Sequence, residues 1–506
     1  MKISFTSPVT DFSQPQRQSP KAILLILLKY IRIFITTLWP ILLIILINPR
    51  SNKGILITSL VIAVTFISLV YSILSYTRFY FFIQDNKVCV RSGVIRKKTL
   101  NVPFDRIQSV DFKQNLLHQF LNVVSVQVDT AGSKGSELEL DAIDFKRAEE
   151  LREIVLAYKR KTIQNDETDQ KSSVNVPALP ITPELILSLS PKDLMKVGIS
   201  ENHLRTAGII IAFFLGIADD IDQLLGWDVY GQLENTTAQM SLFGLLATLV
   251  AIPIFICISF FITLIRTVLR YYGMKFWREG QTFKVVSGLF TRNQKTIQKP
   301  KIQLIRWMTS PLKQIFGIYQ MNIYQATNVE QNKDNSLVIP GCYMTQVEHT
   351  LDMTVPGFKR ALFTSHKMDV SIVIRTVFLF GFLPAVLFGI VAWYNEGVMQ
   401  WLLTLVFPLA IFMGYAYQKK RRLKIHPDYL LSEGGIFGRT FKLVEIYKIQ
   451  SVLIHASPVQ RWRGLTSLHV FTAGGDISFP YLKEEIAKQA RDYIMYRVEK
   501  DHHPWM

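Results

Sequence analysis

The sequence predicts an α-helical membrane protein with α+β cytoplasmic domains, in which three transmembrane helical hairpins are each followed by a β-rich unit. Three observations predict this fold class: a hydrophobic composition, six apolar stretches, and a polar pattern that recurs after each pair of stretches. Of the 506 residues, 49% are hydrophobic and 19% are charged, and the mean hydropathy is +0.22. This composition excludes a disordered protein and a nucleic-acid-binding tail.

The charge and the cysteine content further restrict the class of protein. The chain has 57 Lys and Arg residues against 39 Asp and Glu residues, a net charge of +18, which is uncommon for so hydrophobic a soluble protein. Its length suggests about three domains of roughly 150 residues. The three cysteines, Cys89, Cys257 and Cys342, lie in different segments. The sequence therefore offers neither a disulfide framework nor a thiolate zinc site.

Six apolar stretches approach or reach the roughly 20 residues that a helix needs to cross a bilayer core of about 30 Å. They pair into three predicted hairpins, at 29–48 with 55–76, 206–218 with 241–266, and 372–394 with 398–417. The third stretch is the weakest, because Asp219 interrupts it. The first stretch contains Lys29 and Arg32 and ends without an Ala-x-Ala site, which favours an uncleaved helix over a signal peptide.

The distribution of basic residues predicts how these stretches are oriented. The turn at 219–240 holds five acidic residues and no basic residue, so we expect it outside the cell. The segments that leave the fourth and sixth stretches are basic, whereas Arg50 and Lys53 in the first turn disagree with the pattern. The majority of the basic residues that flank the stretches predict a multi-pass protein of the plasma (inner) membrane with both termini in the cytoplasm.

The polar segment after each hairpin repeats one pattern. A glycine is followed 14 residues later by an Ile-Gln pair, and an alanine recurs at a common later offset. The matching residues are Gly93, Ile107 and Ala131; Gly288, Ile302 and Ala326; and Gly435, Ile449 and Ala473. A glycine between two strand-like runs predicts a hairpin turn with a positive φ. We expect the isoleucine in the core and the glutamine paired with a neighbouring backbone; a ligand-facing glutamine is the alternative.

Each repeat also carries a short apolar insertion, at 115–121, 311–317 and 458–464, which we expect to be helical. Apolar residues at helical spacing predict a closing amphipathic helix at 148–158 and at 486–494. The middle repeat shows no clean terminal helix. Strands followed by one helix predict a small curved sheet whose open end the helix closes.

These residues resemble the bacterial pleckstrin-homology (PH) membrane proteins of the YdbS/YdbT type. The resemblance spans nearly the whole chain and is carried by the Ser-Gly-hydrophobic turn and by segments 12–20, 105–110, 116–121 and 130–132. It implies a PH-like β-sandwich or barrel with a C-terminal helix in each cytoplasmic unit, and no established chemistry. The middle repeat departs most, with Lys299-Pro300-Lys301 where the first has Phe104-Asp105-Arg106.

The pattern predicts eight segments along the chain. They are an N-terminal cytoplasmic tail (1–20), hairpin 1 (21–76), PH-like domain 1 (77–161), a linker (162–203), hairpin 2 (204–266), PH-like domain 2 (267–365), hairpin 3 (372–417) and PH-like domain 3 (418–500).

The sequence contains none of the catalytic signatures for which we searched. It has no His-Glu-x-x-His, Walker A, Gly-x-Ser-x-Gly or Gly-x-Gly-x-x-Gly motif. His502 and His503 near the C-terminus fit a solvated end better than a metal site. We therefore predict a protein that is not an enzyme and that has no catalytic residue, metal or cofactor.

Basic residues near the predicted spans form the candidate site, because each Lys or Arg close to an anionic leaflet contributes about 1 kcal/mol to membrane binding. The predicted anionic-lipid contacts are Lys419, Lys420, Arg421, Arg422, Lys424, Arg266, Arg270, Arg96, Lys97, Lys98, Arg292 and Arg439. In PH domains, basic residues of the first hairpin hold phosphorylated headgroups, and the resemblance implies that role for the loop residues of this set. The alternatives are residues that only determine topology, or solvated basic loops.

The predicted function is non-enzymatic binding or scaffolding at the inner face of the cell envelope. Membrane lipids are the expected ligands, a protein partner or a smaller companion of the same family is a second type of partner, and no nucleic acid is expected. The oligomeric state stays open. The alternative function is a transporter or exporter that protects the envelope from membrane-active compounds, which the lack of a central acidic residue in the apolar stretches disfavours. An enzyme acting on lipids ranks last.

Overall fold

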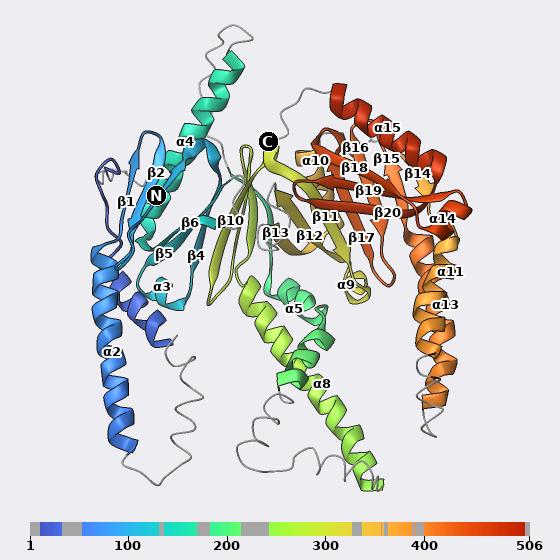
Figure 1. Ribbon diagram of the computed structural model, residues 1–506, viewed down its shortest axis with the longest axis horizontal. Coiled ribbons are helices and arrows are strands. Elements are labelled where there is room, and N and C mark those ends of the chain that lie inside the picture. Colours follow the sequence, from blue (N-terminus) through green and yellow to red (C-terminus); the bar gives the residue numbers. More distant parts are fainter. Residues whose placement is uncertain are drawn as a thin grey trace.

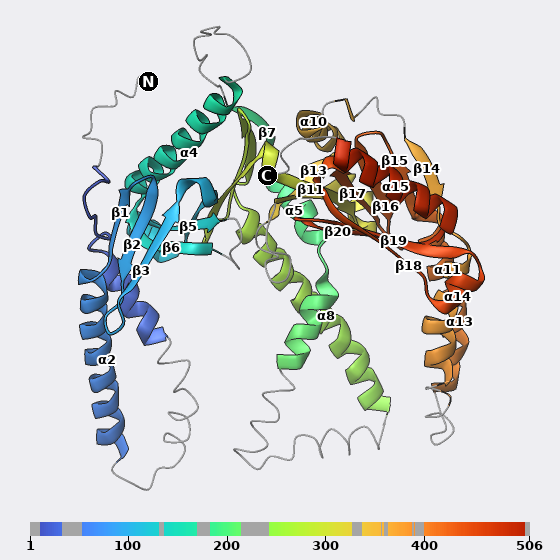
Figure 2. The ribbon, with the colours of Figure 1, turned by 45° about the horizontal axis from the view of Figure 1, so that its top comes forward.

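Apolar helices project in one direction from a layer of antiparallel sheets (Figure 1), and the turned view shows the same arrangement (Figure 2). The computed structural model describes residues 11–32, 53–130, 136–168, 183–213, 242–325, 336–355, 357–358, 363–386, 389 and 399–500. Three apolar helices lead directly into strands: α2 (Lys53–Thr77) into β1 (Tyr80–Gln84), α8 (Leu242–Tyr271) into β8 (Lys275–Glu279), and α13 (Met399–Lys420) into β15 (Arg422–Ile425).

The predicted fold class of three transmembrane helical hairpins is wrong for the part of the chain that the structure describes. There, only Pro253–Tyr271 within α8 is long and apolar enough to cross a membrane, by length and composition. The other apolar helical stretches are Ala63–Thr77 within α2, His203–Phe213 and Ser371–Val386. As described, each has 10–17 residues, fewer than the roughly 20 that a bilayer core requires. Most of the predicted stretch at 29–48 lies outside the described residues, and so does the whole turn at 219–240.

In the described residues, the strands form two seven-stranded and two three-stranded sheets, all with antiparallel neighbours. The first large sheet has the order β6 (Ser136–Asp144), β5 (Val123–Thr130), β4 (Ile107–Gln114), β10 (Arg292–Gln298), β9 (Thr282–Ser287), β8 and β7 (Glu184–Ser188). The second has the order β13 (Ser336–Tyr343), β12 (Ile318–Gln325), β11 (Ile302–Thr309), β17 (Arg439–Glu445), β16 (Tyr429–Gly434), β15 and β14 (Thr364–Lys367). The small sheets are β1, β2 (Lys87–Ser92) and β3 (Lys98–Pro103), and β18 (Ile449–His455), β19 (Leu465–Thr472) and β20 (Gly475–Lys483).

The strands and three closing helices group into three units that follow the sequence repeat. Unit 1 comprises β1–β6 and α4 (Phe145–Thr168), unit 2 comprises β7–β13 and α10 (Met344–Thr354), and unit 3 comprises β14–β20 and α15 (Glu484–Lys500). The closing helices expected for the first and third repeats are confirmed. The middle repeat has one too, because α10 buries Val347 and Leu351 completely. Within the segment 162–203, predicted as a linker, the structure places β7 and α5 (Pro191–Ile199).

Neighbouring units share their sheets instead of each forming a separate sandwich. Unit 1 joins unit 2 where β4 pairs with β10 over three registered residue pairs, from Arg292–Gln114 to Gln294–Phe112. Unit 2 joins unit 3 where β11 pairs with β17 over five pairs, from Ile305–Leu443 to Thr309–Arg439. We call these two junctions seam 1 and seam 2. Each seam satisfies the backbone groups of two strands that would otherwise be exposed sheet edges.

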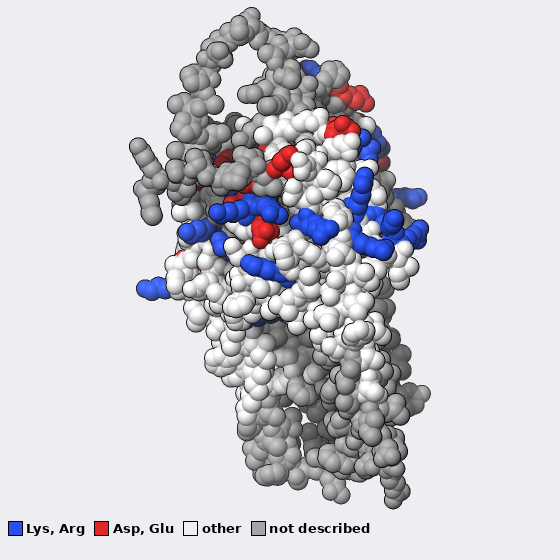
Figure 3. All heavy atoms as spheres, turned by 90° about the vertical axis from the view of Figure 1, so that its left-hand side faces the viewer, with Lys and Arg blue, Asp and Glu red and all other residues white. Residues whose placement is uncertain are grey.

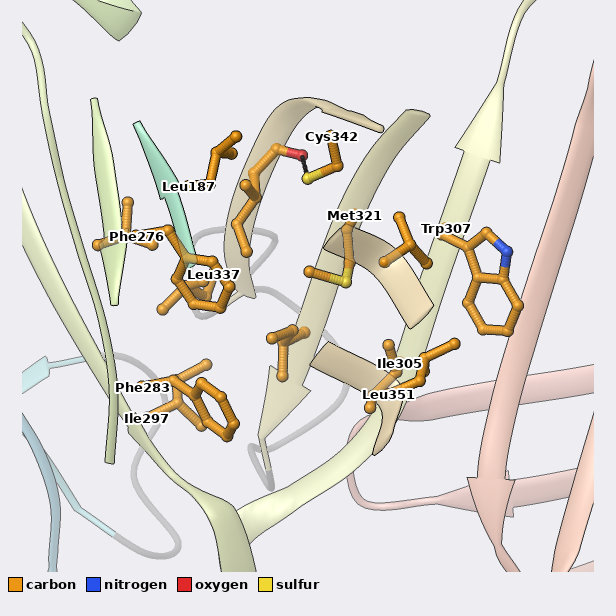
Figure 4. Packing of buried hydrophobic residues seen from close by; sticks show 14 of the residues in the cluster. Leu187, Phe276, Phe283, Ile297, Ile305, Trp307, Met321, Leu337, Cys342 and Leu351 are labelled. Atoms are coloured by element: carbon orange, nitrogen blue, oxygen red, sulfur yellow. Dashed lines mark hydrogen bonds between the residues drawn. The ribbon is translucent and has the colours of Figure 1, made fainter. Parts of the chain in front are cut away.

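Each unit has its own hydrophobic core, and residues cross seam 2 to complete the cores of units 2 and 3. In unit 2, Phe276 and Phe283 from one sheet face Met321 and Leu337 from the other (Figure 4). The unit 2 core also contains Leu431 and Leu443 of unit 3, and the unit 3 core contains Leu304 of unit 2. Seam 2 is therefore held by apolar side-chain burial as well as by backbone hydrogen bonds.

The repeated glycines and isoleucines have the predicted roles. The φ angles of Gly93, Gly288 and Gly435 are 109°, 107° and 122°, and a Cβ on Gly288 would lie 2.0 Å from the carbonyl oxygen of Thr291. Ile107, Ile302 and Ile449 are buried. The glutamines do not share one environment, since Gln303 is buried and Gln450 is exposed. Ala131 and Ala326 lie outside the described residues.

Candidate membrane-facing site

In each unit, one β-hairpin loop lies against the end of an apolar helix: the loop between β2 and β3, between β9 and β10, and between β16 and β17. We call these loops the hairpin tips; they span 93–97, 288–291 and 435–438. In unit 1, Arg78 Nη1 donates to the carbonyl of Val94 at 2.7 Å. In unit 2, the amide of Leu289 donates to the carbonyl of Leu269 at 2.9 Å, which satisfies one of the terminal carbonyls of α8. In unit 3, Lys420 Nζ donates to the carbonyl of Ile436 at 2.6 Å.

The short apolar insertion of each repeat is helical, as predicted, and contacts the start of another helical segment. The three short helices are α3 (Leu116–Phe120), α9 (Pro311–Ile315) and α14 (Pro458–Trp462). Lys21, beside the helix over 22–32, donates to the carbonyl of Leu121 after α3 at 2.6 Å. Lys313 of α9 and Glu201, just before the helix His203–Phe213, form an ion pair at 3.2 Å.

In unit 3, Arg463 after α14 donates to Ser371 Oγ, at the start of α11 (Ser371–Val377), at 2.9 Å. Every unit thus contacts the start of one helical segment through its short helix and the end of another through its hairpin tip. This recurrence places the hairpin tips and short helices of all three units on the side from which the helices project.

Eight of the predicted lipid-contact residues are exposed at or near this side. Arg96 and Lys97 lie in the first hairpin tip and Lys98 begins β3. Arg292 and Arg439 begin β10 and β17 beside the other two tips, and Arg266 and Arg270 lie in the last turns of α8. Lys419, at the end of α13, is also exposed and lies over the ring of Tyr415 at 5.8 Å. These side chains are available to an anionic surface.

The other members of the cluster after α13 are held inside unit 3. Lys420 binds the hairpin tip, and Lys424 forms an ion pair with Glu433 at 2.5 Å. Arg421 donates to the hydroxyl of Tyr417 and to the carbonyl of Ser478, and burial lowers the pKa of its guanidinium. Arg422 is half-buried on β15. This cluster therefore splits into one exposed residue and three with partners in the fold, with Arg422 between the two groups.

The charge distribution agrees with a membrane lying across the helical part. Figure 3 shows Lys and Arg side chains gathered in a band over the sheets of unit 1, above a helical part whose described surface is largely uncharged. Because surface charges lose their influence within a Debye length of about 8–10 Å, only basic groups at this boundary would interact with lipid headgroups. Among the described residues, no group of three His, Cys, Asp or Glu side chains is placed to hold a metal ion.

The sequence reasoning missed Asp111, which extends seam 1 beyond its backbone ladder. Asp111 Oδ1 on β4 accepts from the backbone amide of Thr296 on β10 at 3.0 Å and from the Thr296 hydroxyl at 3.4 Å. Burial raises the pKa of this carboxyl to about 7, against the opposing effect of Lys295. A polar residue in an alternating strand is ordinary in a sequence, so only the pairing of β4 with β10 identifies it.

We predict that Asp111 makes the stability of the protein depend on pH. A folded-state pKa of about 7, above the ordinary 3.8, favours the protonated group on folding, so its contribution is complete below about pH 4 and is lost as the pH rises through 7. The Asp111→Asn variant cannot ionise and should lack this component, at most about 1.4 kcal/mol per pH unit. Denaturant unfolding of the full-length protein in detergent at pH 5 and pH 8 measures it. Equal pH dependence in both proteins would contradict the prediction.

Comparison with known proteins agrees with the repeated architecture. The family described as Bacterial PH domain matches the chain three times, at residues 23–159, 222–352 and 374–498. The UPF0699 transmembrane protein YdbT of Bacillus subtilis (strain 168) is 24% identical over 456 residues, which cover 85% of this chain and 87% of that protein. Neither the family description nor the name of the relative refers to an enzymatic activity. The chain belongs to the bacterial PH domain family, as a membrane protein with three PH-like units.

Proposed function

We propose that the protein is a non-enzymatic membrane protein that presents its three PH-like units as one joined platform on the inner face of the plasma membrane, where they bind anionic lipid and serve as a scaffold for a protein partner. The observation that carries this proposal is the pair of hydrogen-bonded seams, which hold the units side by side. Exposed basic residues beside the hairpin tips support the lipid part.

We further propose that the units and both termini are cytoplasmic. Short connections keep the units beside the membrane, since α2, α8 and α13 each lead within a few residues into a strand. The exposed basic residues beside the hairpin tips support the cytoplasmic face, because Lys and Arg near the ends of membrane helices are enriched on that side. In an otherwise cysteine-free protein, a cysteine introduced by Lys488→Cys on α15 should react with a membrane-impermeant maleimide only after the cells are opened. Labelling in intact cells would contradict the orientation.

The proposed binding of anionic lipid is tested with the positive charges at the first hairpin tip, between β2 and β3. The full-length protein in mild detergent is mixed with phosphatidylglycerol or phosphatidylcholine, and the retained lipid is measured by native mass spectrometry. The triple variant Arg96→Gln, Lys97→Gln, Lys98→Gln should retain less phosphatidylglycerol, with phosphatidylcholine unchanged.

The matched control removes three charges from α15, which lies away from the projecting helices (Figure 1). Its substitutions are Lys488→Gln, Arg491→Gln and Lys500→Gln, so both variants lose the same net charge. The control should bind phosphatidylglycerol like the wild type. An equal loss in both variants, or no loss in the hairpin variant, would overturn a specific lipid role for the hairpin.

A further inference from the structure

The three short helices present apolar side chains to the outside at the same two positions. α3, α9 and α14 begin after the N-caps Asn115, Ser310 and Ser457, whose side chains each accept from a backbone amide of the helix. Each helix is followed by a residue with a positive φ, at 122, 317 and 464. The three helices are therefore structural equivalents, and their outward-facing residues can be compared one by one.

The outermost residue of each short helix is a large apolar side chain that is almost fully exposed. Phe120, Ile315 and Trp462 are 88%, 77% and 86% exposed, respectively. Three residues before each of them, another apolar residue is about half exposed: Leu117, Leu312 and Val459. A single exposed apolar residue needs no explanation, but a pair that recurs at the same place in three repeats indicates a surface that is covered in use.

The hairpin tips add apolar side chains on the same side. Ile95 is 94% exposed, and Phe290 and Phe437 are 47% and 54% exposed. At seam 1 a hairpin tip and a short helix meet, because Gln119 Nε2 of α3 donates to the carbonyls of Leu289 and Phe290 at 3.1 and 3.2 Å. At seam 2, a Cβ on Gly438 would lie 2.0 Å from the carbonyl oxygen of Thr309, just before α9.

We infer that these exposed residues of the short helices and hairpin tips, which we call the apolar tips, insert into the interfacial layer of the lipid bilayer around the helices. The contacts described above fix the tips beside the points where apolar helical segments begin and end. The ring of Phe437 lies 6.4 Å from that of Phe412, inside α13, so this tip reaches along the helix. Apolar and aromatic side chains flanked by Lys and Arg are the composition that binds membrane interfaces.

This inference rests on the proposed placement of all three units on one membrane face, but it does not require the basic residues to bind lipid. Apolar insertion persists at high salt and on neutral lipid, whereas attraction to anionic headgroups is lost, since the Debye length falls to about 3 Å at 1 M salt. An experiment can therefore contradict insertion of the apolar tips without contradicting lipid binding by the basic residues, and the reverse.

The test uses the full-length protein in neutral phosphatidylcholine vesicles at high salt. In a Cys257→Ser background, in which the remaining Cys89 and Cys342 are buried, Phe120→Cys, Ile315→Cys and Trp462→Cys are labelled singly with an environment-sensitive fluorophore. Lipids carrying a nitroxide near the headgroup should quench the fluorescence of all three. The control Tyr496→Cys replaces a 57% exposed residue on α15 and should not be quenched.

Quenching at the control level at all three positions would overturn the inference. Blue-shifted emission without quenching by lipid would also overturn it, because the apolar tips would then be covered by protein, such as a second copy of the chain. Quenching that disappears at high salt would leave only the electrostatic contact of the proposed function.

Discussion

Replacing Trp307 with alanine is expected to lower the free energy of unfolding by about 3–5 kcal/mol, the usual cost of truncating a large buried aromatic residue. Trp307 on β11 is 2% exposed and stacks on Phe441 of β17, with ring centroids 5.1 Å apart and an interplanar angle of 8°. It also meets Phe358 edge-on at 6.3 Å. Because the stack crosses seam 2, the variant should loosen units 2 and 3 together. Denaturant unfolding of the detergent-solubilised protein measures the loss.

The matched control is Trp462→Ala, the same change at a side chain that is 86% exposed, which should alter stability in detergent by less than about 0.5 kcal/mol. Trp307→Phe should cost less than the alanine variant, since it keeps an aromatic ring against Phe441 and the Trp307 indole nitrogen has no hydrogen-bond partner in the described part of the chain. Equal losses for the two alanine variants would show that Trp307 does not hold the seam.

Replacing Lys448 with methionine should cost a similar amount, about 3–5 kcal/mol, because it leaves a largely buried carboxylate without its partner. The Lys448 side chain is 3% exposed and forms an ion pair with Glu445, which is 19% exposed. Its Nζ also donates to the carbonyl of Ile302 across seam 2 at 2.7 Å. The midpoint of denaturant unfolding should therefore fall strongly in the single variant.

The double variant Lys448→Met, Glu445→Gln should recover part of this loss, because the unpaired charge is then removed. An exposed pair provides the comparison: Lys488 and Glu484 on α15 lie 2.8 Å apart and are about half exposed. Lys488→Met should cost no more than about 1 kcal/mol. A double variant as unstable as the single one would assign the effect to the lost Ile302 contact and contradict the ion-pair explanation.

The repeat could be predicted because each residue that identifies it has a role set by its near neighbours in the chain. Gly288 is needed where φ is positive, Ile302 fills a core position, and α9 begins at a capping serine followed by proline. Such features depend on nearby residues and recur whenever the unit recurs. For the same reason the sequence identified the family, which the three family matches confirm.

The seams could not be predicted, because they depend on which strand edges meet. β4 and β10 alternate like other strands, and nothing in either sequence distinguishes pairing with a neighbouring unit from exposure to solvent. The hairpin prediction failed for a related reason: apolar composition suggested six spans, whereas among the described residues only Pro253–Tyr271 of α8 has both the length and the composition of a span.

The candidate site was predictable only in part. Lys419, Lys420 and Arg421 are consecutive basic residues, yet only Lys419 is exposed, while Lys420 and Arg421 have partners in unit 3. Their partners are backbone carbonyls of the hairpin tip and of β20, which are brought near only when unit 3 folds. A charge pattern therefore indicates which side of the protein faces the membrane. It does not separate lipid-facing residues from basic residues that form hydrogen bonds within the folded unit.

The seams also have a consequence for the shape of the membrane. Since β4–β10 and β11–β17 are hydrogen-bonded ladders, the strand-proximal ends of α2, α8 and α13 cannot move apart without breaking them. The three units form a bar of fixed length. With all three on one membrane face, as proposed above, a bilayer of changing curvature would have to bend around the protein or strain its ladders. The weaker point under such a load is seam 1, which has three registered pairs against five in seam 2.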